Sequence, residues 1–105
     1  MKKLLLIGLL GFSSFTHADY CMDIKEFASV LMDARQRGVT EQKAHAILIQ
    51  SKPSSYEDYR VLGSLIDWAY ILPIMDSDTK KKVVIYDFAQ NAYKICERSI
   101  KDAKK

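Results

Sequence analysis

The sequence predicts an all-α protein, a small four-helix bundle in which one disulfide bond links the first and last helices. Three observations lead to this prediction. Apolar residues recur at helical spacing in four successive segments of the chain. Gly38, Pro53 and Pro73 separate these segments, as residues that end helices do. The only two cysteines, Cys21 and Cys96, fall in or beside the first and last segments.

The first 18 of the 105 residues have the pattern of a cleaved signal peptide. Met1–Lys3 is positively charged, Leu4–Phe12 is apolar, and Thr16 and Ala18 stand three and one residues before a cleavage site after Ala18. An N-terminal membrane anchor is the less favoured alternative, because a spanning helix needs about 20 apolar residues. We therefore expect residues 19–105 to form one helical domain, periplasmic or secreted, with no stable membrane insertion after cleavage.

The charge of the chain argues against a nucleic-acid partner. It carries 16 Lys and Arg against 13 Asp and Glu, and loss of Lys2 and Lys3 with the signal peptide leaves it nearly neutral. Nucleic-acid-binding domains usually carry a strong basic surface. We therefore expect no nucleic-acid partner.

In an oxidising compartment, Cys21 and Cys96 can form one intramolecular disulfide bond. Such a bond would stabilise a domain of this size, which buries only a modest core. An intermolecular bond and a redox-active site stay open as alternatives. The chain has no Cys-x-x-Cys spacing, which argues against redox chemistry.

The first helix is predicted over Asp23–Arg37, with Gly38 as its left-handed C-cap residue. The pattern puts Gln36 on the polar face. Arg35 points toward the buried side, and we favour a side chain that lies along apolar surface and reaches the last carbonyl groups of its own helix. The alternative is an anchor for an anion or carboxylate inside a groove. The predicted core face consists of Ile24, Phe27, Ala28, Leu31 and Ala34.

The second helix is predicted to begin after an N-cap at Thr40 and to end before Pro53. Its predicted core stripe consists of Ala44, Ile47 and Leu48. His45, the only histidine of residues 19–105, falls beside this stripe and is expected at the surface or at its boundary. No partner for a catalytic base is evident near it in the sequence.

Tyr59–Leu72 is apolar nearly all round and is predicted as the central helix, covered by the other three. Ser54 and Glu57 have the spacing of a capping box that opens it. Gly63 suggests close approach of another helix. For Trp68 we favour packing under the second helix over a role as an interface anchor.

The last helix is predicted over Thr79–Lys101, with Ser77 or Asp78 as its N-cap. The acidic loop before it lacks the Gly and the Glu that an EF-hand calcium loop requires. The predicted core face consists of Ile85, Phe88, Ala92, Ile95, Cys96 and Ser99.

Catalytic motifs are absent from the sequence, which has no glycine-rich phosphate loop, nucleophile elbow or His-Glu-x-x-His motif. Within residues 19–105, one histidine and two cysteines that are expected to pair also offer little for nucleophilic catalysis or zinc binding. We therefore expect neither an enzyme nor a bound metal or cofactor.

Aromatic side chains outside the predicted core are the remaining functional candidates. Tyr86 and Tyr93 lie seven residues apart on one edge of the last helix, and with Trp68 and Arg35 they form the candidate interaction surface. The sequence thus favours a non-catalytic binding or protein-interaction module whose partner is another protein. The alternatives are a periplasmic stress chaperone, similar in size, helicity and single disulfide to the HdeA-type acid-stress proteins, and an inhibitor or immunity protein of a periplasmic enzyme.

One set of residues spans most of residues 21–96: Cys21, the segment Ala34–Thr40, Trp68–Tyr70 with Pro73, Phe88 and Cys96. In this set the chain after the signal peptide resembles small secreted helical proteins of gamma-proteobacteria that have no assigned activity. The resemblance implies the compartment, the helices and the disulfide bond, and it implies no chemistry.

Overall fold

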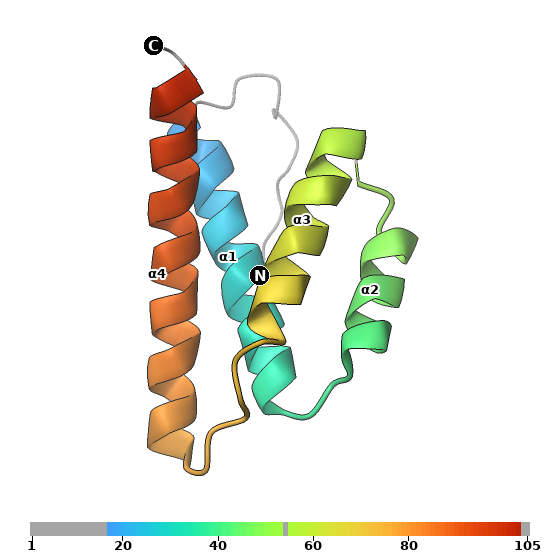
Figure 1. Ribbon diagram of the computed structural model, residues 1–105, viewed down its shortest axis with the longest axis vertical. Helices are drawn as coiled ribbons and strands as arrows, with labels where there is room; N and C mark the ends of the chain where they lie inside the picture. Colours follow the sequence, from blue (N-terminus) through green and yellow to red (C-terminus); the bar gives the residue numbers. More distant parts are fainter. Residues whose placement is uncertain (1–16, 54, 104–105) are drawn as a thin grey trace, which may run out of the picture.

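The computed structural model describes residues 17–53 and 55–103, which form four helices (Figure 1). This confirms the predicted all-α fold. The predicted signal peptide lies outside the described residues, except for its last two residues, which open the first helix. The helices are α1 (His17–Gln36), α2 (Glu41–Gln50), α3 (Tyr56–Ala69) and α4 (Asp78–Ala103).

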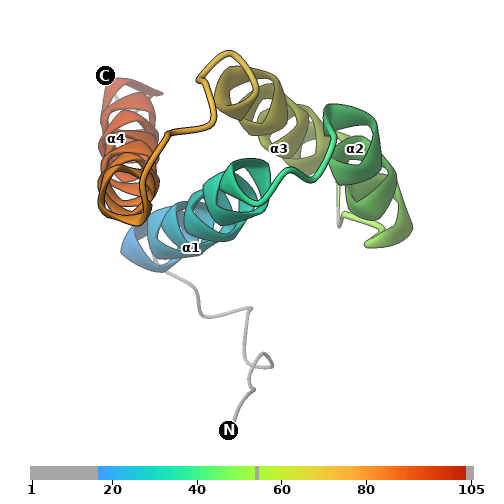
Figure 2. The same ribbon diagram turned by 90° about the horizontal axis from the view of Figure 1, so that it is seen from below.

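The helices lie in the spatial order α4, α1, α3, α2, as the view from below shows (Figure 2). The contact of α1 with α4 is the most extensive one, and these two helices run in opposite directions (Figure 1). α3 packs against α1 on one side and α2 on the other. The buried apolar side chains come from all four helices: Cys21, Ile24, Ala28, Leu31 and Met32; Ala44 and Leu48; Leu65, Ile66 and Ala69; Phe88, Ala89 and Ala92.

The predicted disulfide bond between Cys21 and Cys96 is confirmed, and it joins α1 to α4. The two Cα atoms are 5.6 Å apart, within the usual range for a bridged pair. Cys21 is fully buried. The bond is compatible with an oxidising compartment.

The predicted start of α1 at Asp23 is wrong, because the helix begins six residues earlier, at His17. Its predicted C-terminus at Gly38 is confirmed, with φ +93° at that glycine. The amide of Gly38 donates to the Arg35 carbonyl at 3.0 Å, and the amide of Val39 donates to the Ala34 carbonyl at 3.1 Å. These two bonds form a Schellman motif, which needs a left-handed residue where the glycine stands.

Side-chain caps open α2 and α4 as the sequence predicts. The Thr40 hydroxyl accepts a hydrogen bond from the Lys43 amide at 3.1 Å. The Ser77 hydroxyl accepts one from the Lys80 amide at 3.2 Å. Both caps satisfy amides that a helix leaves unpaired in its first turn.

The cap of α3 is one residue later than predicted. The hydroxyl of Ser55 accepts a hydrogen bond from the Asp58 amide at 3.0 Å, so Ser55 is the N-cap in place of Ser54. Ser54 itself lies outside the described residues. Two adjacent serines offer the same hydroxyl, so the sequence pattern could not distinguish between them.

The prediction that all three other helices cover the Tyr59–Leu72 stretch is wrong for α4, which has no extensive contact with α3. α4 meets α3 at Trp68 and Phe88, whose ring centres are 4.6 Å apart. The main packing of α4 is with α1, to which the disulfide bond ties it. The predicted stripe of α2 is wrong at Ile47, which is 54% exposed because α2 lies at the edge of the bundle and packs mainly against α3.

No other helix approaches Gly63 closely, contrary to the prediction. A Cβ atom built at Gly63 meets no atom within 4 Å apart from those of its own helix turn. We therefore expect Gly63→Ala to raise the free energy of unfolding by about 0.5–1 kcal/mol, because alanine favours the helix over the unfolded chain. Urea denaturation followed by circular dichroism measures the change.

Gly38→Ala is the matched control for this substitution. Its site is equally open, but its φ of +93° strains any L side chain. The control should therefore lower stability. A Gly63→Ala protein less stable than the wild type would contradict the prediction.

Among the described residues, none of the four helices combines the length and the apolar character that crossing a membrane requires.

Candidate functional site

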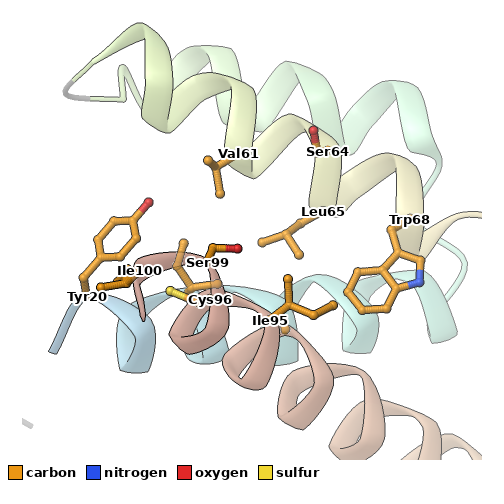
Figure 3. A pocket seen from close by; sticks show the side chains of 11 residues that line it. Tyr20, Val61, Ser64, Leu65, Trp68, Ile95, Cys96, Ser99 and Ile100 are labelled. Atoms are coloured by element: carbon orange, nitrogen blue, oxygen red, sulfur yellow. The ribbon is translucent and has the colours of Figure 1, made fainter. Parts of the chain in front are cut away.

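An apolar cavity of about 360 Å³ lies between α3 and α4, with the N-terminal half of α1 forming one side (Figure 3). The cavity lies where α4 packs along α1 and leaves one face of α3 uncovered. Ile95 and Ser99 were predicted to lie in the core, and this prediction is wrong. Both side chains are exposed, Ile95 by 49%, and both line the cavity.

The α3 wall of the cavity consists of Val61, Leu65 and Trp68. These positions are four and three residues apart, so helical geometry places them on one face. Cys96 of the disulfide bond and Ile95 contribute to the α4 wall. Apolar side chains therefore line both walls of the cavity. Cys96 in the α4 wall is fixed by its disulfide bond to Cys21.

The polar side-chain groups among the cavity-lining residues are the hydroxyl groups of Tyr20, Ser64 and Ser99 and the indole N–H of Trp68. Burial raises the pKa of the Tyr20 phenol, and the nearby carboxylates of Asp58 and Glu57 raise it further. The phenol is therefore uncharged at neutral pH. Figure 3 shows Tyr20 and Ser99 toward the end of the cavity that lies away from Trp68.

Trp68 is half-buried and packs against Phe88 of α4, so the prediction that it packs under the second helix is wrong. Its indole ring lies at one end of the cavity (Figure 3). Of the four predicted interaction residues, Trp68 alone lines this cavity.

Tyr86 and Tyr93 lie on α4 outside the cavity. Tyr86 is 60% exposed, and its hydroxyl accepts a hydrogen bond from Gln90 Nε2 at 2.8 Å. Tyr93 is half-buried, with the Lys25 ammonium of α1 5.8 Å from its ring centre. Its hydroxyl donates a hydrogen bond to the Glu97 carboxylate, which raises the pKa of the phenol. Tyr86 thus faces solvent, while Tyr93 contacts the neighbouring helix α1.

Arg35 points toward neighbouring structure, as predicted, but its acceptor is not a carbonyl of its own helix. Its Nε atom donates to the Leu72 carbonyl at 3.1 Å, and the guanidinium carbon lies 4.9 Å from the centre of the Tyr70 ring. Arg35 therefore joins the end of α1 to the loop after α3. This contact favours a structural role over an anion anchor.

The prediction that Gln36 lies on the polar face of α1 is wrong, because its side chain is only 3% exposed. Its Nε2 atom donates to the Pro73 carbonyl at 3.0 Å, and its Oε1 atom accepts from the Met75 amide at 2.7 Å. One amide side chain thus satisfies two backbone groups of the loop between α3 and α4, which makes its burial favourable.

Tyr70 adds a further connection at the same end of the bundle. Its hydroxyl donates to the Val39 carbonyl at 2.6 Å, which links the end of α3 to the loop between α1 and α2. The pKa of the Tyr70 phenol is raised above its usual value, mainly by burial. The Arg35 guanidinium lowers this pKa in part, and the Glu41 carboxylate raises it. We refer to Arg35, Gln36 and Tyr70 as the loop clamp, since together they hold the α1–α2 loop and the α3–α4 loop against the helix ends.

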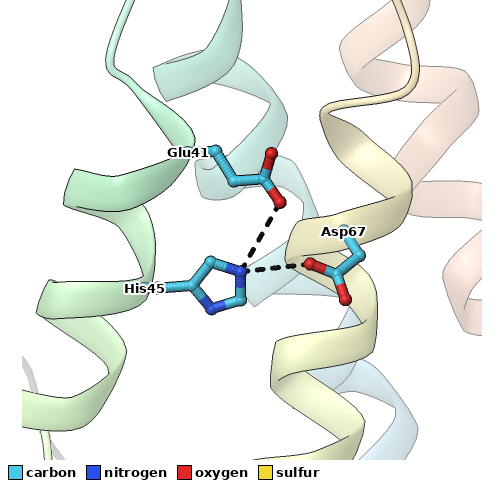
Figure 4. A group of neighbouring side chains, drawn as sticks. All are labelled: Glu41, His45 and Asp67. Atoms are coloured by element: carbon cyan, nitrogen blue, oxygen red, sulfur yellow. Dashed lines mark hydrogen bonds and ion pairs between the residues drawn. The ribbon is translucent and has the colours of Figure 1, made fainter.

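A second side-chain cluster joins α2 to α3 on the surface and consists of Glu41, His45 and Asp67 (Figure 4). Nε2 of His45 lies 3.1 Å from Oδ1 of Asp67 and 3.7 Å from Oε2 of Glu41. The sequence analysis missed this group. The spacing of Glu41 and His45 places them on one helix face, but nothing in the sequence connects Asp67 with them.

The fold and the cavity define a small disulfide-linked helical bundle with an apolar cavity between two of its helices. Searches against protein-family models, curated proteins and solved structures each returned no match.

Proposed function

We propose that the protein is a non-catalytic binding protein, periplasmic or secreted, and that the cavity between α3 and α4 is its binding site. The observation that supports this proposal is the cavity itself. At about 360 Å³ it falls within the size range of ligand pockets, about 300–1,000 Å³, and it has their composition of hydrocarbon with a few polar groups.

The lining of the cavity favours binding over catalysis. Among its lining residues are hydroxyl groups, and no carboxylate, imidazole or free thiol. General acid–base catalysis usually draws on such titratable groups. His45 lies next to two carboxylates, but it is not among the cavity-lining residues.

The ligand class that best fits this cavity is an amphiphile with a single aliphatic chain. The apolar walls would contact the aliphatic chain of the ligand, and the end of that aliphatic chain would lie near Trp68. The hydroxyl groups of Tyr20 and Ser99, toward the other end, would contact an uncharged polar head group. Burial of apolar surface supplies the free energy of binding, at about 25 cal/mol per Å².

Trp68 provides a direct test, because it is the only tryptophan of the chain. Titration with monomeric decanol or dodecanol should give a saturable change in tryptophan emission, as the aliphatic chain replaces water beside the indole ring. Ser99→Leu should weaken binding by about tenfold, since its larger side chain fills the cavity. Tenfold corresponds to about 1.4 kcal/mol.

Lys94→Leu is the matched control, because Lys94 is exposed on α4 and does not line the cavity. It should leave the affinity unchanged. An emission signal that does not saturate, or equal weakening in both variants, would refute the cavity as the binding site.

A second candidate function is binding of another protein, the partner that the sequence favours. The supporting observation is that Tyr86 and Val83, one turn apart on α4, are 60% and 54% exposed. Tyrosine is among the residue types that are enriched at the centre of protein interfaces. Loss of crosslinked partners on Tyr86→Asp, with binding of aliphatic chains unchanged, would distinguish this function from the first.

A further inference from the structure

We propose that Glu41, His45 and Asp67 form a binding site for a divalent transition-metal ion, with Zn²⁺ as the ion of first choice. The site would join α2 to α3 at the surface (Figure 4). It is independent of the cavity, since none of its residues lines the cavity.

The three donor atoms converge on one point. All of them lie within 4.8 Å of one another, and the two carboxylate oxygens are 3.1 Å and 3.7 Å from Nε2 of His45. Zinc binds nitrogen and oxygen ligands at about 2.0–2.2 Å in tetrahedral geometry, which separates neighbouring donors by roughly 3.3–3.6 Å. The two nitrogen–oxygen separations need shifts of only a few tenths of an ångström to reach this range. The two carboxylate oxygens, which lie up to 4.8 Å apart, would approach each other by roughly 1 Å, which rotation of these exposed side chains allows.

The arrangement around His45 has more acceptors than one imidazole nitrogen can serve. Nε2 carries at most one proton, which suffices for the hydrogen bond with Asp67 at 3.1 Å. The Glu41 oxygen at 3.7 Å lies beyond hydrogen-bonding distance of the same nitrogen. A cation between the three groups would interact with all of them at once.

The donor set also indicates the class of ion. One imidazole nitrogen and two carboxylate oxygens suit zinc and similar transition metals, whereas Mg²⁺ and Ca²⁺ prefer oxygen ligands alone. Three protein ligands leave the fourth tetrahedral position to water or to another donor.

The position of the site suggests a structural consequence. α2 contributes only Ala44 and Leu48 to the buried core, and its Ile47 and Ile49 are more than half exposed. An ion held by Glu41 and His45 of α2 and by Asp67 of α3 would tie this outer helix to the bundle. Since a ligand that binds only the folded state stabilises it, zinc should raise the unfolding temperature.

The experiment is a titration of the purified chain, without a histidine tag and in metal-free buffer, with ZnCl₂. Isothermal titration calorimetry should give one ion per chain. Saturating ZnCl₂ should raise the thermal midpoint by about 5 °C, and an equal concentration of MgCl₂ should leave it unchanged.

Two substitutions separate ligation from other effects. His45→Gln keeps a hydrogen-bond donor for Asp67 but removes the imidazole ligand, so it should abolish the zinc-dependent shift. Glu57→Gln is the control: Glu57 lies in the first turn of α3, as Glu41 does in α2, and it is paired with Arg60 and is not part of the cluster. It should leave the shift unchanged.

Each result either supports or overturns the proposal. One ion per chain, a zinc-dependent shift and its loss in His45→Gln support it. Absence of zinc binding overturns it and identifies the cluster as an ion pair. A shift that persists in His45→Gln also overturns it, since the zinc then binds elsewhere.

Discussion

Replacement of both cysteines, as Cys21→Ser with Cys96→Ser, is expected to lower the free energy of unfolding by about 4 kcal/mol. The bond closes a loop of 75 residues, and its loss releases the unfolded chain from that constraint. Small domains have a total stability of about 5–15 kcal/mol, so the variant should lose much of its stability margin. Urea denaturation followed by far-UV circular dichroism measures the change.

Reduction of the wild-type protein with dithiothreitol is the control for this double substitution. It breaks the same bond without changing either residue, so both proteins should unfold at a similar urea concentration. A loss below about 1 kcal/mol in both would mean that packing between α1 and α4 holds the fold without the cross-link.

Gln36→Ala is expected to lower the free energy of unfolding by about 2 kcal/mol. The substitution removes both hydrogen bonds to backbone groups of the loop, those with the Pro73 carbonyl and the Met75 amide. Both bonds are only partly buried, and a hydrogen bond of this kind contributes about 0.5–1.5 kcal/mol. Thermal and urea unfolding of the variant measure the loss.

Gln42→Ala is the matched control, because Gln42 is an exposed glutamine on α2. It should change the stability by less than about 0.5 kcal/mol. If the two variants were equally stable, the loop clamp would contribute nothing through Gln36.

The parts of the fold that could be predicted depend on short-range signals. Gly38, Thr40 and Ser77 determine helix ends through bonds to residues three to five positions away, so their roles can be identified from local sequence. The cysteines could be paired because the chain contains only two of them.

The errors concern contacts between elements. Periodicity identifies the apolar face of a helix but not the neighbour that covers it, so Ile95 was assigned to the core although α3 does not cover it. Gln36 was assigned to solvent because the pattern counts every glutamine as polar. Its burial depends on two backbone groups of a loop 37 and 39 residues away.

The candidate sites could be predicted only in part, for the same reason. Trp68 stood out as a large aromatic residue, but the cavity beside it depends on how α3 and α4 diverge. The contact between His45 and Asp67 spans 22 residues and two helices. Sequence spacing contains no information about such a pair.

The disulfide bond also determines how the cavity can change its width. Cys96 belongs to one wall, and its bond to Cys21 cross-links α1 and α4 into one covalently joined helix pair. The opposite wall is α3, which carries α2 on its outer side and is held to α1 by non-covalent contacts. To accommodate a wider ligand, α2 and α3 would therefore have to move outward together, with the loop clamp as the hinge, while the cross-linked pair α1–α4 keeps its arrangement.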